Sequence, residues 1–215
     1  MGEGGLAMNN PGDWYNKEQD INDRKGQGNA LFTQAAVELM SEMRSLWEQH
    51  VAWTRMTIIS IASDAPDQGV VTRRLLRNAT DMGDAIRPFY GQAAATEFAR
   101  LMREHLVLAA QLVEAAKAGD NRAVARTERL WFRNADEIAA FLSLINPCLS
   151  EAALREMLHE HLELVKAQAD ARLNGRYARD IAIYDRGEAQ ALAMADAISS
   201  GIIAQFPKIF SREKD

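Results

Sequence analysis

The stretch REHLVLAAQLVEAAKAGD, residues 103–120, decides the fold, because the chain nearly repeats it 56 residues later. There it returns as HEHLELVKAQADARLNGR, residues 159–176, again with apolar residues three or four positions apart and a glycine near the end. This spacing is typical of an amphipathic helix, and glycine after the last turn commonly ends one. We therefore expect each stretch to be a helix that ends in a tight turn.

Other segments repeat at the same interval, which indicates that more than one helix is repeated. LLRNATDM (75–82) aligns with WFRNADEI (131–138) at 56, EQHVAWTRMTIISIASD (48–64) fits at 55, and AQALAMADAI (189–198) matches RNATDMGDAI (77–86) at 112. Helices that alternate with short turns at a fixed period indicate a repeated hairpin. The chain is thus predicted to contain three copies of one helical hairpin.

Clusters of Pro, Gly, Asn and Asp, such as SDAPDQG (63–69) and NPCLS (146–150), interrupt the helical pattern. We predict an all-α fold, a helical bundle of about six helices built from three pseudo-repeated αα-hairpins with a period of about 56 residues. The bundle is a single domain, residues 30–208, between an irregular leader, 1–29, and a flexible tail, 209–215. The expected helices are 30–63, 69–87, 92–117, 121–145, 150–173 and 177–205.

Composition narrows the function classes. The 215 residues carry a net charge of −5, which argues against a nucleic-acid partner. No apolar run reaches the length of a membrane span, and the single cysteine rules out an internal disulfide framework. Without a visible signal peptide the expected location is the cytoplasm, although a longer precursor would leave export open. The oligomeric state is not predicted.

Each predicted hairpin contains one histidine at a fixed place: His50, His105 and His161. The turn follows fourteen residues later, and an amide follows after 28 or 29 residues, at Asn78, Asn134 and Gln190. At about 1.5 Å per residue, the histidine and the amide both lie roughly 21 Å from the turn. Every hairpin should therefore hold a histidine beside an amide, halfway along its length and inside the apolar stripe.

Two acids share a helix face with these amides. Asp81 follows Asn78 by three residues, and Glu137 follows Asn134 by three, whereas the third copy has Ala193 at that place. We expect one buried polar layer in which the acids need partners, because an unpaired buried carboxylate costs several kcal/mol. The predicted layer comprises His50, Asn78, Asp81, His105, Asn134, Glu137, His161 and Gln190.

The leading interpretation of this layer is a site for a divalent transition metal, Fe, Mn or Zn, with redox or oxygen-related chemistry as the activity class. His50, His105 and His161 would be ligands, and Asp81 and Glu137 ligands or acceptors behind them. Amides that fix histidine tautomers would complete the site. Such a site should release its metal as the histidines protonate, near pH 6.

Two alternatives stay open beside the metal site. In the first, the layer is a hydrogen-bonded network that fixes helix register in a non-catalytic binding or interaction module. In the second, it recognises a polar group of a small-molecule ligand. The sequence does not decide whether the protein is an enzyme.

Four strings also resemble an uncharacterised family of small all-helical bacterial proteins, common in bacilli and clostridia. They are LWEQHVAWTR (46–55), RNADEIAAFLSLINP (133–147), EHLELVKAQADARLNG (160–175) and GIIAQFP (201–207). The resemblance spans roughly residues 40–207. It implies a helical fold with histidines at the positions of His50, His105 and His161. The chain departs from the family at GEAQA (187–191), where relatives carry a further histidine string.

Overall fold

A computed structural model of the chain describes residues 33–211, and helices separated by short loops make up nearly all of that range. No strand occurs within it, so the prediction of an all-α bundle is confirmed for the described residues. The predicted leader, 1–29, lies outside them. The helices are α2 (Gln34–Ala62), α3 (Gln68–Lys117), α4 (Asn121–Ile145), α5 (Glu151–Leu173), α6 (Tyr177–Gln205) and α7 (Pro207–Phe210).

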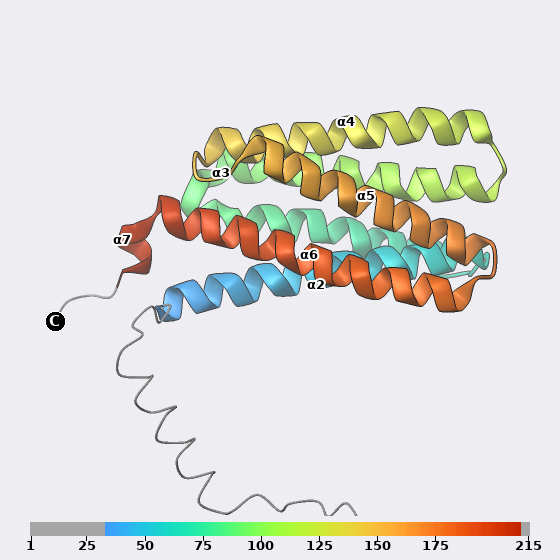
Figure 1. Ribbon diagram of the computed structural model, residues 1–215, viewed down its shortest axis with the longest axis horizontal. Coiled ribbons are helices and arrows are strands. Elements are labelled where there is room, and N and C mark those ends of the chain that lie inside the picture. Colours follow the sequence, from blue (N-terminus) through green and yellow to red (C-terminus); the bar gives the residue numbers. More distant parts are fainter. Residues whose placement is uncertain (1–32, 212–215) are drawn as a thin grey trace, which may run out of the picture.

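Helix α3 contains two of the predicted helices, because it folds back on itself (Figure 1). The reversal is at Gly91, whose φ of 79° and ψ of 176° are not helical, three residues after Pro88. A left-handed φ is readily adopted only by glycine. The two arms of α3 therefore correspond to the predicted helices 69–87 and 92–117.

The helices pack as a closed bundle with their axes roughly antiparallel (Figure 1). Helix α2 packs against α3 and α6, α3 packs against α4, and α5 packs against both α4 and α6. The side chains that face the middle are buried, among them Trp131, Phe98 and Met43. Within the described residues, no helix combines the length and the apolar character that crossing a bilayer requires.

The same turn ends α2, α3 and α5. The second residue after the helix has a positive φ at Asp64 (51°), Gly119 (71°) and Gly175 (68°). The next backbone N–H then donates to a carbonyl five residues earlier, which is the six-to-one bond of a Schellman motif. These bonds run from Ala65 to Ser60, from Asp120 to Ala115 and from Arg176 to Ala171. All three turns lie at one end of the bundle (Figure 1).

The bundle extends two residues beyond the boundary predicted at 208. Helix α7 ends at Phe210, whose side chain is buried. Its ring stacks on that of Phe89, with 5.8 Å between the ring centroids. This contact joins α7 to α3 beside the Gly91 reversal, and the predicted tail beyond Ser211 lies outside the described residues.

Gly83 lets the two arms of α3 approach each other. A Cβ at this position would lie 2.6 Å from the backbone oxygen of Ala95 and 2.8 Å from the Cβ of Ala99. We expect Gly83→Ala to lower the free energy of unfolding by about 1–3 kcal/mol, because the arms must move apart. Urea denaturation measures this change.

Gly187→Ala is the matched control, since an added Cβ there has no neighbour within 4 Å. It should leave stability unchanged or raise it by up to about 1 kcal/mol, because alanine is the better helix former. Equal stability of the two variants would contradict the close approach at Gly83.

Candidate metal centre

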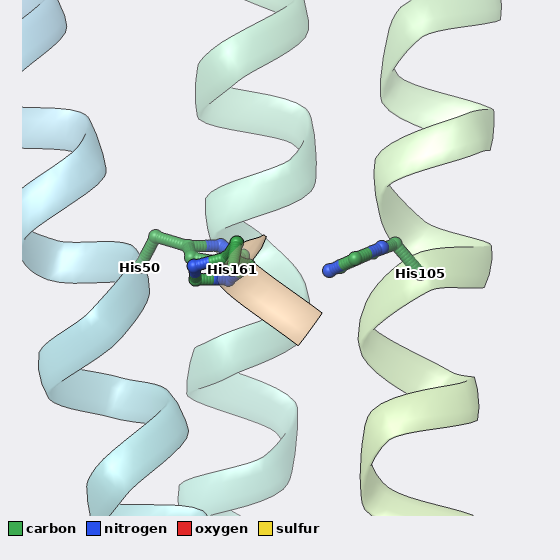
Figure 2. Close-up of side chains that lie close together, drawn as sticks. All are labelled: His50, His105 and His161. Carbon is green, nitrogen blue, oxygen red and sulfur yellow. Dashed lines mark hydrogen bonds between the residues drawn. The ribbon is translucent and has the colours of Figure 1, made fainter. Parts of the chain in front are cut away.

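Three histidines from three different helices meet in the middle of the bundle. His50 lies on α2, His105 on the second arm of α3 and His161 on α5, and their side chains point toward one another (Figure 2). One ring nitrogen from each histidine lies within 4.8 Å of the corresponding nitrogens of the other two. Their exposed fractions are 1%, 3% and 2%. The structure thus brings together the three residues that the sequence placed at one height.

The closest pair is His50 and His161, whose Nε2 atoms are 3.4 Å apart. His105 lies slightly farther away, with its ring centroid 6.0 Å from that of His50 and 6.1 Å from that of His161. The cluster is therefore compact but slightly wider on the His105 side.

An asparagine holds His50 from behind. The Nδ1 atom of His50 is 3.2 Å from Oδ1 of Asn78, and Nδ2 of Asn78 donates to the backbone oxygen of Leu46 at 3.0 Å. In an α-helix that same oxygen accepts the backbone N–H of His50, four residues later. The amide therefore clamps one helical turn of α2 and the imidazole that this turn carries.

His105 is held in the same way. Its Nδ1 atom is 3.2 Å from Oδ1 of Asn134, and Nδ2 of Asn134 donates to the backbone oxygen of Leu101 at 3.1 Å. Leu101 again precedes the histidine by four residues. Asn78 and Asn134 are both essentially inaccessible to solvent.

These bonds fix the tautomers of two histidines. A backbone carbonyl can only accept a hydrogen bond, so it must face the NH₂ group of the asparagine, and the amide oxygen must face the imidazole. An amide oxygen also only accepts, so Nδ1 of His50 and of His105 must carry the proton. Nε2 of each ring is then unprotonated, and its lone pair is free to bind a cation.

The third histidine is held less completely. Nε2 of Gln190 donates to the backbone oxygen of Met157 at 2.7 Å, the carbonyl four residues before His161. Oε1 of Gln190 and Nδ1 of His161, however, are both buried without a hydrogen-bond partner. The His161 tautomer is therefore not fixed by this amide, unlike those of His50 and His105.

The two acids lie outside the cluster, and the expectation that they are buried in the layer was wrong. The side chain of Asp81 is 27% exposed and lies 3.5 Å from Arg77, whereas that of Glu137 is 47% exposed and lies 3.6 Å from Arg133. Each arginine precedes its acid by four residues, the spacing of a surface ion pair. The repeated acid thus pairs with the repeated arginine.

Burial makes the cluster hard to protonate. It lowers the pKa of His50 from 6.5 to about 4 and that of His105 to about 3, and it holds the pKa of His161 well below 6.5. For His105 and His161, repulsion from the neighbouring imidazoles lowers the pKa further. The imidazoles are therefore neutral at pH 6, which moves the expected acid release of a metal below that pH.

Sequence reasoning missed two features around the cluster. The rings of Trp47 and Trp131 lie 5.7 Å from His50 and 5.4 Å from His105, and the indole N–H of each is buried without a partner. A buried ion pair also joins α2 to α6, where Arg55 donates to the carboxylate of Asp180 at 2.5 Å. The ion pair had no sequence signal, because Arg55 and Asp180 lie 125 residues apart. Trp47 precedes His50 by three residues on α2, so its contact could have been expected from the helical spacing.

No family model, curated protein or solved structure matches this chain. The resemblance to a bacterial family accordingly stays a prediction, and the chemistry of the site must be argued from its own geometry.

The metal-free protein is expected to lose stability as the pH falls from 7 to 5. The pKa values of His50 and His105 in the folded chain, about 4 and about 3, lie below the 6.5 of an ordinary histidine. The unfolded chain therefore binds more protons in this range, and acid favours it. Urea unfolding at pH 7, 6 and 5 in the presence of a chelator measures the slope.

His105→Gln should make that slope shallower, because it removes one buried imidazole. A free energy of unfolding that does not change between pH 7 and pH 5 would contradict the burial of three neutral rings.

Proposed function

We propose that the protein binds one divalent transition metal ion through His50, His105 and His161. The observation that carries the proposal is the convergence of three buried imidazoles, two of which have Nδ1 committed to an amide and Nε2 left with a free lone pair. Neutral imidazole nitrogens are the commonest protein ligands of such ions. The amides of Asn78 and Asn134 would orient the ligands from behind, as partners of metal-bound histidines usually do.

The spacing of the nitrogens supports this proposal. Two nitrogens that each lie about 2.05 Å from a tetrahedral zinc ion are about 3.3 Å apart. The Nε2 atoms of His50 and His161 are 3.4 Å apart. A small movement of His105 would complete a tripod of three ligands on one side of the ion.

The ligand set favours zinc or iron over manganese. Imidazole suits zinc and iron, whereas manganese prefers carboxylate and water oxygens. Because Asp81 and Glu137 are paired with arginines at the surface, they do not belong to the proposed ligand set. We therefore propose Zn²⁺ as the first ion to test, followed by Fe²⁺.

A water molecule would be the simplest fourth ligand. A cavity of about 10 Å³ is lined by His161 and by Thr54, whose buried hydroxyl has no partner, but not by His50 or His105. That volume is close to the minimum for one water. Since none of the described carboxylates joins the histidine cluster, a hydroxide formed from this water would offset part of the charge of the buried ion.

We also infer that the chain consists of three repeated hairpins and belongs to the helical bacterial family that it resembles. Support comes from contacts that recur in each hairpin. The same turn ends α2, α3 and α5, and an amide side chain bonds to the carbonyl four residues before each triad histidine. Triplication of one histidine and one amide would create a three-ligand site on the axis of the bundle.

One observation favours a second candidate, a purely structural network. With Nδ1 of His161 unpartnered, this ring can carry its proton on Nε2 and donate it to Nε2 of His50 at 3.4 Å. A buried hydrogen bond of this kind would fix the register of α2 and α5 without any metal. Metal analysis separates the two functions.

The purified protein is expected to contain about one equivalent of zinc or iron, or to take up one equivalent of Zn²⁺ after treatment with a chelator. Zinc at one hundred times its dissociation constant should raise the free energy of unfolding by about 2.7 kcal/mol. Elemental analysis and thermal unfolding measure the two effects.

His105→Ala should abolish stoichiometric binding, whereas His159→Ala is the control. His159 lies outside the triad, beside Asp136 at 2.8 Å, with its side chain 37% exposed. No bound metal, and no thermal shift with zinc or iron, would overturn the metal proposal and leave the structural network.

A further inference from the structure

A pocket of about 510 Å³ opens at the turn end of the bundle, between α3, α4 and α5. This volume lies within the range of small-molecule sites. Helices α4 and α5 lie close together where α5 begins and diverge toward the α5–α6 turn (Figure 1). The pocket occupies the space that this divergence leaves.

Small residues keep the pocket from filling. Ala109 and Ala116 on α3 and Ala169 on α5 line it. Each lies on a face where a larger side chain would reach into the space between the diverging helices. Leu and Val side chains form much of the remaining wall, whereas Lys117, Lys166, Asp170 and Asn174 make part of it polar. A bound molecule would therefore meet a partly apolar surface with polar groups beside it.

The pocket ends close to the histidine triad. Ala109 follows His105 by four residues and Val165 follows His161 by four, and both line the pocket. Four residues are about one helical turn, or about 6 Å. Trp131 also lines the pocket, and its ring centroid lies 5.4 Å from that of His105, so it lies beside both the pocket and the triad.

The charges at the rim are already neutralised. Three charged residues line the pocket, and each has a partner of opposite charge within the protein. The pairs are Lys117 with Asp64, Lys166 with Glu128 and Glu163, and Asp170 with Arg176. A charged ligand would have to compete with these partners, whereas an uncharged ligand would not.

One polar group in the lining has no partner. Among the residues that line the pocket, only Trp131 has a buried side-chain N or O atom without a hydrogen bond, its indole N–H. Trp131 is 1% exposed. A buried donor of this kind usually finds an acceptor. The Trp131 N–H has less than 1 Å² of accessible surface, so a ligand in the pocket reaches it only when the indole shifts toward the pocket.

We propose that this pocket binds an uncharged, largely apolar small molecule that carries one hydrogen-bond acceptor, such as a ketone or an ester, and that the Trp131 indole shifts to donate to this acceptor. The proposal does not depend on a bound metal, because the walls and the donor are present without one. Trp131 would also transmit the presence of the ligand to His105.

Prodan, a neutral naphthalene with one ketone, is a suitable fluorescent probe. We expect saturable binding to the full chain, with a blue shift of prodan emission, both with a chelator and with added zinc. Ala116→Trp narrows the pocket and should raise the dissociation constant about tenfold or more. Ala140→Trp is the control, because Ala140 is also exposed on a helix but does not line the pocket.

Trp131→Phe keeps an aromatic ring and removes the N–H, so it should weaken prodan binding about fivefold. Methyl decanoate should displace prodan better than decanoate does. The proposal is overturned if prodan binding does not saturate, or if the Ala116→Trp variant binds prodan as tightly as the Ala140→Trp variant. It is also overturned if the Trp131→Phe variant binds prodan as tightly as the original chain, or if decanoate displaces prodan better than methyl decanoate does. Loss of metal binding alone leaves all these outcomes unchanged, which keeps this test separate from that of the metal site.

Discussion

Two buried asparagines determine which nitrogen of two imidazoles faces the middle of the bundle. Asn78 and Asn134 each donate to a backbone carbonyl of the helix that carries the histidine, and this contact directs the amide oxygen at Nδ1. Nδ1 must then be the protonated nitrogen, and Nε2 faces the other rings. The chemistry of the centre follows from this constraint, since an imidazole with the opposite tautomer would present a proton to an incoming cation.

The constraint also explains why a polar cluster can be buried so deeply. Each asparagine has bonds at both ends of its amide, so that burying it leaves few unmade hydrogen bonds. The imidazoles stay neutral because burial lowers their pKa values. Among the three histidine–amide pairs, the unsatisfied atoms are confined to His161 and Gln190, the least complete pair. If Nε2 of His161 binds a cation, the proton of that ring must lie on Nδ1. Oε1 of Gln190 is an acceptor without a partner and could then receive this proton's hydrogen bond.

Much of the fold could be predicted from the sequence, because it depends on local signals. Apolar spacing gave the helices, and the positions of Asp64, Gly119 and Gly175 gave the turns. The distance from each histidine to its turn then placed the imidazoles at one height. The exposure of Asp81 and Glu137 could not be predicted in the same way. Glu137 lies only about 60° around the helix from Asn134, so periodicity does not separate a buried position from an exposed one here. In the structure Glu137 lies at the surface beside Arg133.

Contacts between distant helices carried no sequence signal. The buried pair of Arg55 and Asp180 joins residues 125 positions apart. Arg55 ends the string LWEQHVAWTR, but nothing in the sequence marks Asp180 as its partner. The pocket beside Trp131 likewise depends on the angle between α4 and α5, which side-chain packing sets. Periodicity identifies the buried face of each helix, but it does not identify where packing leaves a space.

The tautomers of His50 and His105 most directly test the claim that Asn78 and Asn134 fix the proton on Nδ1. They can be determined by ¹⁵N-detected NMR of metal-free protein at pH 7 with ¹⁵N-labelled histidine. The account predicts that both rings carry their proton on Nδ1 and have an unprotonated Nε2. On addition of one equivalent of Zn²⁺, the Nε2 signals of all three triad histidines should move while both Nδ1 protons stay in place. A proton on Nε2 of His50 or His105, or rings that titrate like free histidine, would contradict it.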